Sequence, residues 1–156
     1  MAAPLPRPVE IEISIECERW LGAEPALEAL VRGAAARALG DRPGALTLLL
    51  ADDDFVRDLN RRYRGIDKAT NVLSFPALQA FPGRLGDIVL AFETVASEAR
   101  AQGKLLRDHA RHLVVHGVLH LLGRDHEVEA EAEAMEALER SILAELGVAD
   151  PYLARD

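Results

Sequence analysis

The segment at residues 9–17 reads VEIEISIEC and alternates strictly between apolar and polar side chains. Because successive side chains of a strand point to opposite faces, this alternation predicts a strand with one buried and one wet face. The continuous apolar run ALTLLLA at residues 45–51 predicts a second strand that is buried. One half-wet strand and one buried strand indicate a sheet that other elements must cover.

Apolar residues at helical spacing, with glycines at the ends of several segments, predict the remaining elements. Further strands are expected at 72–75 and 87–91, and helices at 25–40, 52–65, 94–102, 105–122 and 127–146. The resulting order β-α-β-α-β-β-α-α-α predicts an α+β fold, with a four-stranded mixed sheet packed with about five helices. Residues 1–156 are expected to form a single domain, and residues 1–8, with three prolines, a disordered tail.

The net charge of −8 on its face argues against a nucleic-acid partner, but the charge is unevenly distributed. Residues 57–124 carry 11 basic and 6 acidic side chains, whereas both flanking segments are acidic. A local basic surface can bind phosphates inside an acidic protein. Charge alone favours a plainer interpretation, in which the arginines are scattered and the acidic end is a solvated helix face.

Cysteine usage and hydropathy indicate the compartment. The single cysteine, Cys17, can form no internal disulfide, and no apolar run approaches the length of a membrane span. The first residues lack the apolar core of a secretory signal. We therefore expect a cytoplasmic protein with no membrane and no disulfide partner.

All five histidines lie between residues 109 and 126, and the segment from 116 reads HGVLHLLGRDH. His116 and His120 are one helical turn apart on one face, Gly123 lets the chain turn back, and His126 follows. A lone helical histidine is more often a surface or core residue than a ligand, but the third histidine after a glycine turn sharpens the signal. Three nitrogen ligands with a position left for water are typical of a catalytic site, so we expect one Zn²⁺ ion.

Two histidines upstream could compete as ligands. His112, His116 and His120 would span about 12 Å along one straight helix, too far for one ion, so His126 is kept as the third ligand. His112 and His109 are then candidates to support the ligands or to contact substrate. The spacing also matches that of metzincin proteases, but the general-base glutamate after the first histidine is here Gly117, which disfavours proteolysis.

Several motifs now resemble one family. HGVLHLLGRDH is similar to the zinc signature of the YbeY family of bacterial endoribonucleases. NVLSFP at 71–76, LGDIVL at 85–90, YRG at 63–65 and the ending EAMEALERSILAELGVADPY at 133–152 resemble further segments of that family. The resemblance covers roughly residues 45–152.

The resemblance implies an α+β fold with a zincin-like metal cleft and three zinc-binding histidines. It implies a single-strand-specific, zinc-dependent endoribonuclease acting in 16S ribosomal RNA 3′-end maturation, small ribosomal subunit biogenesis and ribosome quality control. RNA and the small ribosomal subunit or its assembly factors are the partners it implies, and Arg64 in YRG is an activity residue. The alternatives are a non-catalytic zinc-containing assembly factor and another zinc hydrolase, such as a peptidase.

Phosphodiester cleavage gives the candidate site residues their roles. Arg64 would stabilise phosphate charge, and His116 would hold the zinc whose bound water is the nucleophile. Without the resemblance, Arg64 would be taken for an exposed helix-end arginine. The candidates for substrate binding are Arg61, Arg62, Lys68, Ser74, Phe75 and His112. For Ser74 a strand-edge hydrogen bond, and for Phe75 a place in the core, are the commoner roles.

Overall fold

The computed structural model describes residues 10–40, 42, 44–76, 84–123 and 129–152. Within them, strands and helices follow one another in this order: β1 (Glu10–Ile15), α1 (Arg19–Ala23), α2 (Leu27–Leu39), β2 (Ala45–Ala51), α3 (Asp53–Arg64), β3 (Val72–Pro76), β4 (Arg84–Ala91), α4 (Phe92–Ala101), α5 (Leu106–Leu121) and α6 (Glu129–Glu145). The predicted α+β class is confirmed. Residues 1–8, expected to form a tail, lie outside the described residues.

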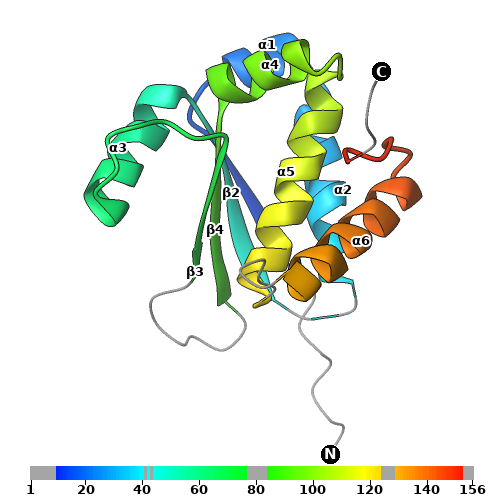
Figure 1. The fold of residues 1–156 in the computed structure, drawn as a ribbon. Helices are drawn as coiled ribbons and strands as arrows, with labels where there is room; N and C mark the ends of the chain where they lie inside the picture. Colours follow the sequence, from blue (N-terminus) through cyan, green and yellow to red (C-terminus); the bar gives the residue numbers. More distant parts are fainter. Residues whose placement is uncertain (1–9, 41, 43, 77–83, 124–128, 153–156) are drawn as a thin grey trace, which may run out of the picture.

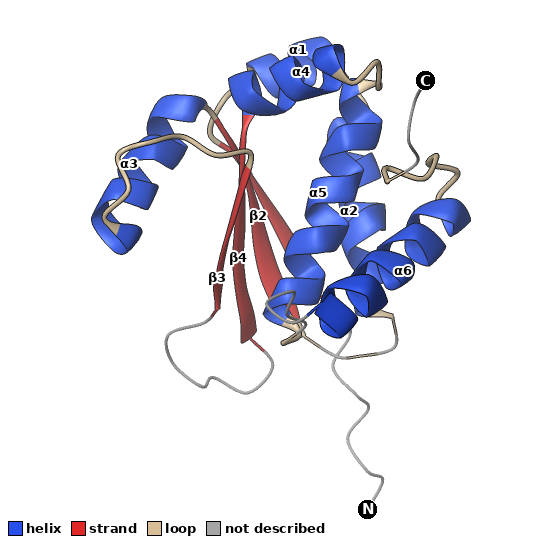
Figure 2. Ribbon diagram, in the orientation of Figure 1, coloured by secondary structure: helices blue, strands red, loops and turns tan. Residues whose placement is uncertain are grey.

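The strands form one mixed sheet in the order β1-β2-β4-β3. β1 pairs with β2 and β2 with β4 in parallel, whereas β3 runs antiparallel to β4. Figures 1 and 2 show α2, α5 and α6 on one side of the sheet, α3 on the other, and α1 and α4 at one end. The predicted four-stranded mixed sheet is therefore confirmed.

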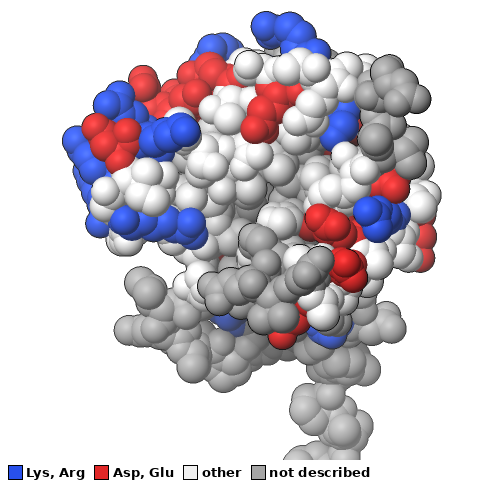
Figure 3. All heavy atoms as spheres, in the orientation of Figure 1, with Lys and Arg blue, Asp and Glu red and all other residues white. Residues whose placement is uncertain are grey.

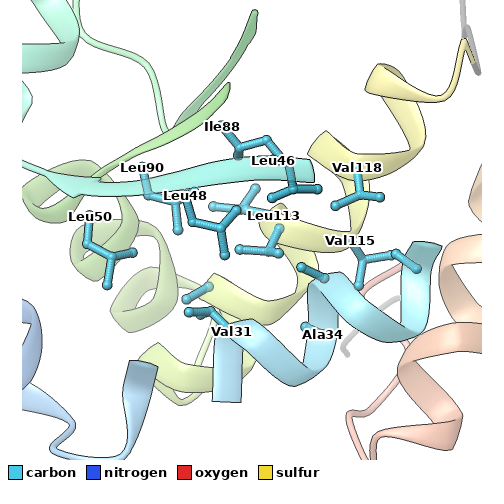
Figure 4. Packing of buried hydrophobic residues seen from close by; sticks show 14 of the residues in the cluster. Val31, Ala34, Leu46, Leu48, Leu50, Ile88, Leu90, Leu113, Val115 and Val118 are labelled. Carbon is cyan, nitrogen blue, oxygen red and sulfur yellow. The ribbon is translucent and has the colours of Figure 1, made fainter. Parts of the chain in front are cut away.

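The main core lies between the sheet and the pair α2 and α5, as the close view in Figure 4 shows. Alternate residues of the central strands, Leu46, Leu48 and Leu50 on β2 and Ile88 and Leu90 on β4, are at most 1% exposed. Burying an aliphatic side chain of this size contributes about 1.5–3 kcal/mol. This packing fixes α5, the helix that carries most of the histidines, against the sheet.

A smaller apolar cluster lies on the opposite face of the sheet, under α3. Val56 of α3 is fully buried in it together with Ala51, Leu73 and Val89 of the strands. The side chain of Asp52 accepts a hydrogen bond from the Phe55 amide at 2.9 Å, which caps the start of the helix. At the other end Gly65 has φ of +70°, the left-handed conformation that suits glycine.

Two elements differ from expectation. About five helices were predicted, and α1 was not among them, because its five residues are too few to show a helical period. Its Trp20 is fully buried and donates from Nε1 to the Ala51 carbonyl at 2.8 Å. β4 begins at Arg84 rather than Asp87, because the glycine-containing segment continues the strand through a register shift opposite Ala45 and Leu46.

Cys17 is buried and forms no disulfide within the described residues. Among those residues, no helix is both long enough and apolar enough to cross a membrane.

Candidate functional site

α5 brings two histidines to one point. His116 and His120 occupy its last two turns, and their Nε2 atoms lie 3.0 Å apart with ring centroids separated by 4.6 Å. The helix stops directly after them, where Gly123 has φ of +88°, as the sequence predicts for a chain that turns back. Because His116 and His120 are one helical turn apart, their imidazole nitrogens converge.

This convergence fits a metal ion. Two nitrogens bound to one zinc at about 2.0–2.1 Å can be at most about 4 Å apart, so 3.0 Å is compatible with a shared ion. His126, the predicted third ligand, lies outside the described residues. Within the described part of the chain no group of three or more His, Cys, Asp or Glu side chains is arranged for a metal. The zinc triad and its cleft therefore stay predictions.

The other ring nitrogen of His116 is held by a carboxylate. Nδ1 of His116 makes a short hydrogen bond with Oε1 of Glu139, which comes from α6. An ionised carboxylate only accepts hydrogen bonds, so Nδ1 of His116 carries the proton and donates. The lone pair of the imidazole is then on Nε2, the atom that faces His120.

Glu139 is fully buried, and its partners keep it ionised. Burial alone would raise the pKa of Glu139, but hydrogen bonds from His112, His116 and Tyr152 outweigh it and lower the pKa to about 2. Tyr152 donates its hydroxyl to Oε2 of Glu139. Burial and this carboxylate raise the pKa of Tyr152, so the phenol stays a proton donor.

His112 lies on the same side of α5 as Glu139 and Tyr152. Its Nε2 is 3.3 Å from the Tyr152 hydroxyl and 3.5 Å from Oε2 of Glu139, and its side chain is only 13% exposed. This position favours the supporting role that the sequence left open, while its role in binding substrate stays a prediction.

His109 belongs to a separate buried cluster. Its Nε2 is 2.9 Å from Oε1 of Glu98, which also accepts from Asn71 at 2.9 Å. Burial lowers the pKa of His109, against the opposing effect of Glu98. The cluster ties the start of β3 to α4 and α5, and it lies more than one helical turn before the converging histidines.

Gly117 allows β3 to approach α5 beside the histidines. A Cβ atom at Gly117 would lie 3.0 Å from Cγ2 of Ile88 and 3.1 Å from Oγ of Ser74. These distances leave no room for the glutamate that metzincins carry at this place. The same close approach puts Ser74 beside the turn of α5 that begins at His116.

Arg64 lies at the end of α3, facing β3. Its Nη2 is 3.4 Å from the Ser74 carbonyl, and its guanidinium carbon is 5.8 Å from the centre of the Phe75 ring. Among the described residues no carboxylate forms an ion pair with it. Arg64 and Phe75 therefore lie together beside β3, whose Ser74 approaches Gly117 of α5, while a site shared by Arg64 and the histidines stays a prediction.

The other basic candidates lie on α3 and the loop after it. Arg61 and Arg62 pair with Asp58 at 2.8 and 3.0 Å, and Lys68 contributes its carbonyl to Asn60 at 2.8 Å. Figure 3 shows side chains of both signs crowded over α3 and few charges between α3 and α5. Much of the positive charge counted in the sequence is thus balanced locally, and the roles of these residues in binding substrate stay predictions.

Glu139 and Tyr152 were not predicted as site residues from the sequence. Glu139 occupies a position of the apolar stripe of α6, four residues after Met135 and three before Ile142, and all three are buried. A charged residue on a core stripe was a signal that the sequence did offer. Tyr152 gave no such signal, because it lies beyond the last helix.

Comparisons with known proteins agree with the motifs. A family model described as "Endoribonuclease YbeY" matches residues 15–147. "Endoribonuclease YbeY" of Paramagnetospirillum magneticum is 52% identical over 92% of this chain and 96% of that protein. The protein of the same name from Rhodopseudomonas palustris strain BisA53 is 51% identical over 96% of this chain and 93% of its own length.

The fold is also similar to a solved structure. The solution structure of TM1509 from Thermotoga maritima aligns with 92% of this chain and 99% of that chain, with a TM-score of 0.55 and 23% identity. At this identity the similarity concerns the fold alone.

Proposed function

This chain belongs to the YbeY family of endoribonucleases, and from that membership we propose that it is a zinc-dependent endoribonuclease acting on single-stranded RNA. The observation that carries the zinc dependence is the convergence of the His116 and His120 Nε2 atoms, 3.0 Å apart. Arg64, whose Nη2 lies 3.4 Å from the Ser74 carbonyl, would supply the positive charge that phosphodiester chemistry needs.

The proposed site residues fall into metal ligands and residues that bind the RNA. His116, His120 and His126 would hold one Zn²⁺ ion, which when bound acts as a Lewis acid and lowers the pKa of water. Arg64 binds non-bridging phosphate oxygens and stabilises the charge that develops on them. Phe75, against which Tyr63 packs edge-on at 5.7 Å, gives a neighbouring base an aromatic surface.

The biological setting follows from the family. We assign the chain to ribosomal RNA processing, with 16S 3′-end maturation, small-subunit biogenesis and ribosome quality control in the cytoplasm as its expected roles. The small ribosomal subunit or its assembly factors are the expected partners. A peptidase is disfavoured, because Gly117 packs against Ile88 and Ser74 where a metzincin carries its general base.

RNA cleavage by purified protein tests this proposal. Wild type is compared with a His116→Ala/His120→Ala double variant purified identically, on single-stranded and structured ribosomal RNA, with and without chelator. We expect cleavage of single-stranded regions by wild type, and loss of cleavage in the variant and under chelation. Equal cleavage by both proteins would indicate a contaminating nuclease. No cleavage by zinc-loaded wild type would favour a non-catalytic assembly factor.

Arg64→Ala tests the second half of the proposal. Removing a charge-stabilising donor from a site of this kind typically lowers the rate about 10²–10³-fold. Arg37→Ala is the matched control, because Arg37 is exposed on α2 and pairs with Glu145 at the surface. Arg64→Ala with the wild-type rate and Arg37→Ala unchanged would remove Arg64 from the site.

A further inference from the structure

Behind His116, on the side away from His120, three side chains meet from three parts of the chain. Glu139 comes from α6, His112 from α5, and Tyr152 from the segment that follows α6. Figure 1 shows this segment turning back toward α5 after α6 ends. The three side chains contact one another and His116 through the hydrogen bonds described above.

A carboxylate in this position needs a reason. Glu139 is fully buried, and an aliphatic residue would continue the apolar stripe of Met135 and Ile142 without the desolvation cost. What a carboxylate does here and a leucine cannot is accept from Nδ1 of His116. The burial of the charge therefore points to a role in orienting that ring.

The hydrogen bonds of the cluster determine which nitrogen or oxygen carries each proton. Both oxygens of Glu139 are acceptors, so the Tyr152 hydroxyl donates to Oε2 and His116 donates from Nδ1 to Oε1. Nε2 of His112 must then carry a proton and donate it to Tyr152 or Glu139. A protonated Nε2 cannot bind a metal ion. Of the histidines around Glu139, His116 is the one whose Nε2 is directed at His120.

The end of the described chain is itself anchored. The amide of Tyr152 donates to Oδ1 of Asp150 at 2.8 Å, and Nε of Arg140 donates to the same oxygen at 3.2 Å. The Arg140 guanidinium lies 5.2 Å from the centre of the Tyr152 ring. Tyr152 is thus held from two sides before its hydroxyl reaches Glu139.

We propose that Glu139 and Tyr152 are positioning residues for a metal ion: they fix the imidazole of His116 as the Nδ1-protonated tautomer with Nε2 facing His120. The affinity of the site for Zn²⁺ then depends on a carboxylate and a phenol that touch neither metal nor RNA. Partners of this kind typically change metal affinity about 10–100-fold when they are removed. This inference rests on the proposed function, because it needs the histidines to bind zinc.

The test is Zn²⁺ affinity, measured by competition with a chromophoric chelator. Glu139→Gln keeps the size of the side chain and removes its charge, and we expect it to weaken zinc binding about 10-fold or more. Tyr152→Phe keeps the ring and removes one hydrogen bond, and we expect a smaller loss, about 3–10-fold. Glu133→Gln is the control, because it makes the same charge change at an exposed position of α6.

A second readout separates positioning from stability. In zinc-free protein, imidazole nitrogen chemical shifts report the tautomer of His116 near neutral pH. We expect wild type and Glu133→Gln to show Nδ1-protonated His116, and Glu139→Leu, which has no acceptor, to lose that preference. A role in packing alone would leave the tautomer and the zinc affinity of Glu139→Gln unchanged.

The outcomes distinguish this inference from the proposal beneath it. If wild type binds no zinc, the metal site itself is wrong. If wild type binds zinc and cleaves RNA while Glu139→Gln and Tyr152→Phe bind zinc with wild-type affinity, the positioning role alone is overturned. Weaker binding by Glu139→Gln and Tyr152→Phe with Glu133→Gln unchanged supports it.

Discussion

At the scale of single residues, Gly117 controls how closely α5 approaches strands β3 and β4. A Cβ there would lie 3.0 Å from Cγ2 of Ile88, which is fully buried in the sheet and cannot easily move. We expect Gly117→Ala to lose the usual helix-propensity gain and to lower the free energy of unfolding by about 1 kcal/mol. Urea unfolding of the purified variant measures this.

Gly33 provides the matched control for that prediction. It lies inside α2 and is exposed, and a Cβ added to it would meet no atom within 4 Å. Gly33→Ala should therefore raise the free energy of unfolding by up to about 1 kcal/mol. If Gly117→Ala stabilises the protein as much as Gly33→Ala does, the close approach of α5 to β3 and β4 does not limit the side chain at this position.

The lowered pKa of Glu139 leads us to expect that the stability of the protein depends on pH. Its pKa is lowered in the folded protein from 4.5 to about 2, so its contribution is present above about pH 4.5 and is lost as the pH falls toward 2. A shift of this size corresponds to roughly 3 kcal/mol, at about 1.4 kcal/mol per pKa unit. In zinc-free protein, wild type should exceed Glu139→Gln in stability most at about pH 6, and the difference should narrow by about pH 3. A difference that stays constant over this range would contradict the account.

The sequence predicted the individual residues unevenly. The spacing of His116 and His120 was enough to predict that they share a point, since helical geometry fixes where side chains one turn apart emerge. Glu139 and Tyr152 are brought to His116 by tertiary packing across 23 and 36 residues of sequence. No local pattern encodes such a contact, although a glutamate on an apolar stripe gave a partial signal.

At the scale of elements, the start of α3 is fastened to the start of α4. The Asp53 carboxylate accepts from the Thr94 amide at 3.0 Å, and the Asp53 amide donates to Glu93 at 3.2 Å. We expect Asp53→Ala to cost about 1–3 kcal/mol of unfolding free energy, because the Thr94 amide loses its partner. Because α3 carries Arg64, RNA cleavage should fall while zinc affinity on α5 stays at the wild-type value.

Asp54 is the control for this prediction. It is the next residue of α3 and exposed, so Asp54→Ala should change the stability by no more than about 0.5 kcal/mol. Cleavage and stability data on both variants test the link. Equal effects of the two substitutions would mean that the contact with α4 does not hold α3.

Helices and strands were predicted correctly where the segment is long enough to show its apolar period. The helix around the histidines and the alternating first strand follow directly from apolar spacing. The strand order β1-β2-β4-β3 did not, because register and order depend on which elements cover the sheet. α1 and the first residues of β4 were missed because a five-residue helix and a bulged, glycine-containing strand lack a clear period.

At the scale of the whole molecule, zinc should stabilise the fold. His116 and His120 lie on α5, and their supports Glu139 and Tyr152 lie on α6 and the segment that follows it, so an ion bound only to the folded state favours all three together. Zinc at about 100 times its dissociation constant adds about 2.7 kcal/mol, which raises Tm by roughly 5–10 °C. Thermal unfolding with zinc and with chelator measures this, and His116→Ala should show no difference between the two.

Composition alone does not show which basic residues are available to bind phosphate. The basic middle segment suggested a phosphate-binding surface, but Arg57, Arg61 and Arg62 pair with aspartates on the same part of the protein. Arg64 differs from them because its described contacts are a carbonyl and an aromatic ring. Only the folded structure distinguishes Arg64, which has no described carboxylate partner, from the three arginines that pair with aspartates.

We propose that RNA cleavage depends on one zinc ion held by His116, His120 and His126. The most direct measurement is the cleavage rate of chelator-stripped protein as Zn²⁺ is added back in steps up to and beyond one equivalent. We expect a rate that rises from near zero and reaches its plateau at one equivalent, with no rise in the His116→Ala/His120→Ala variant. Stripped protein that already cleaves at the full rate, or a rate that does not respond to zinc, would contradict it.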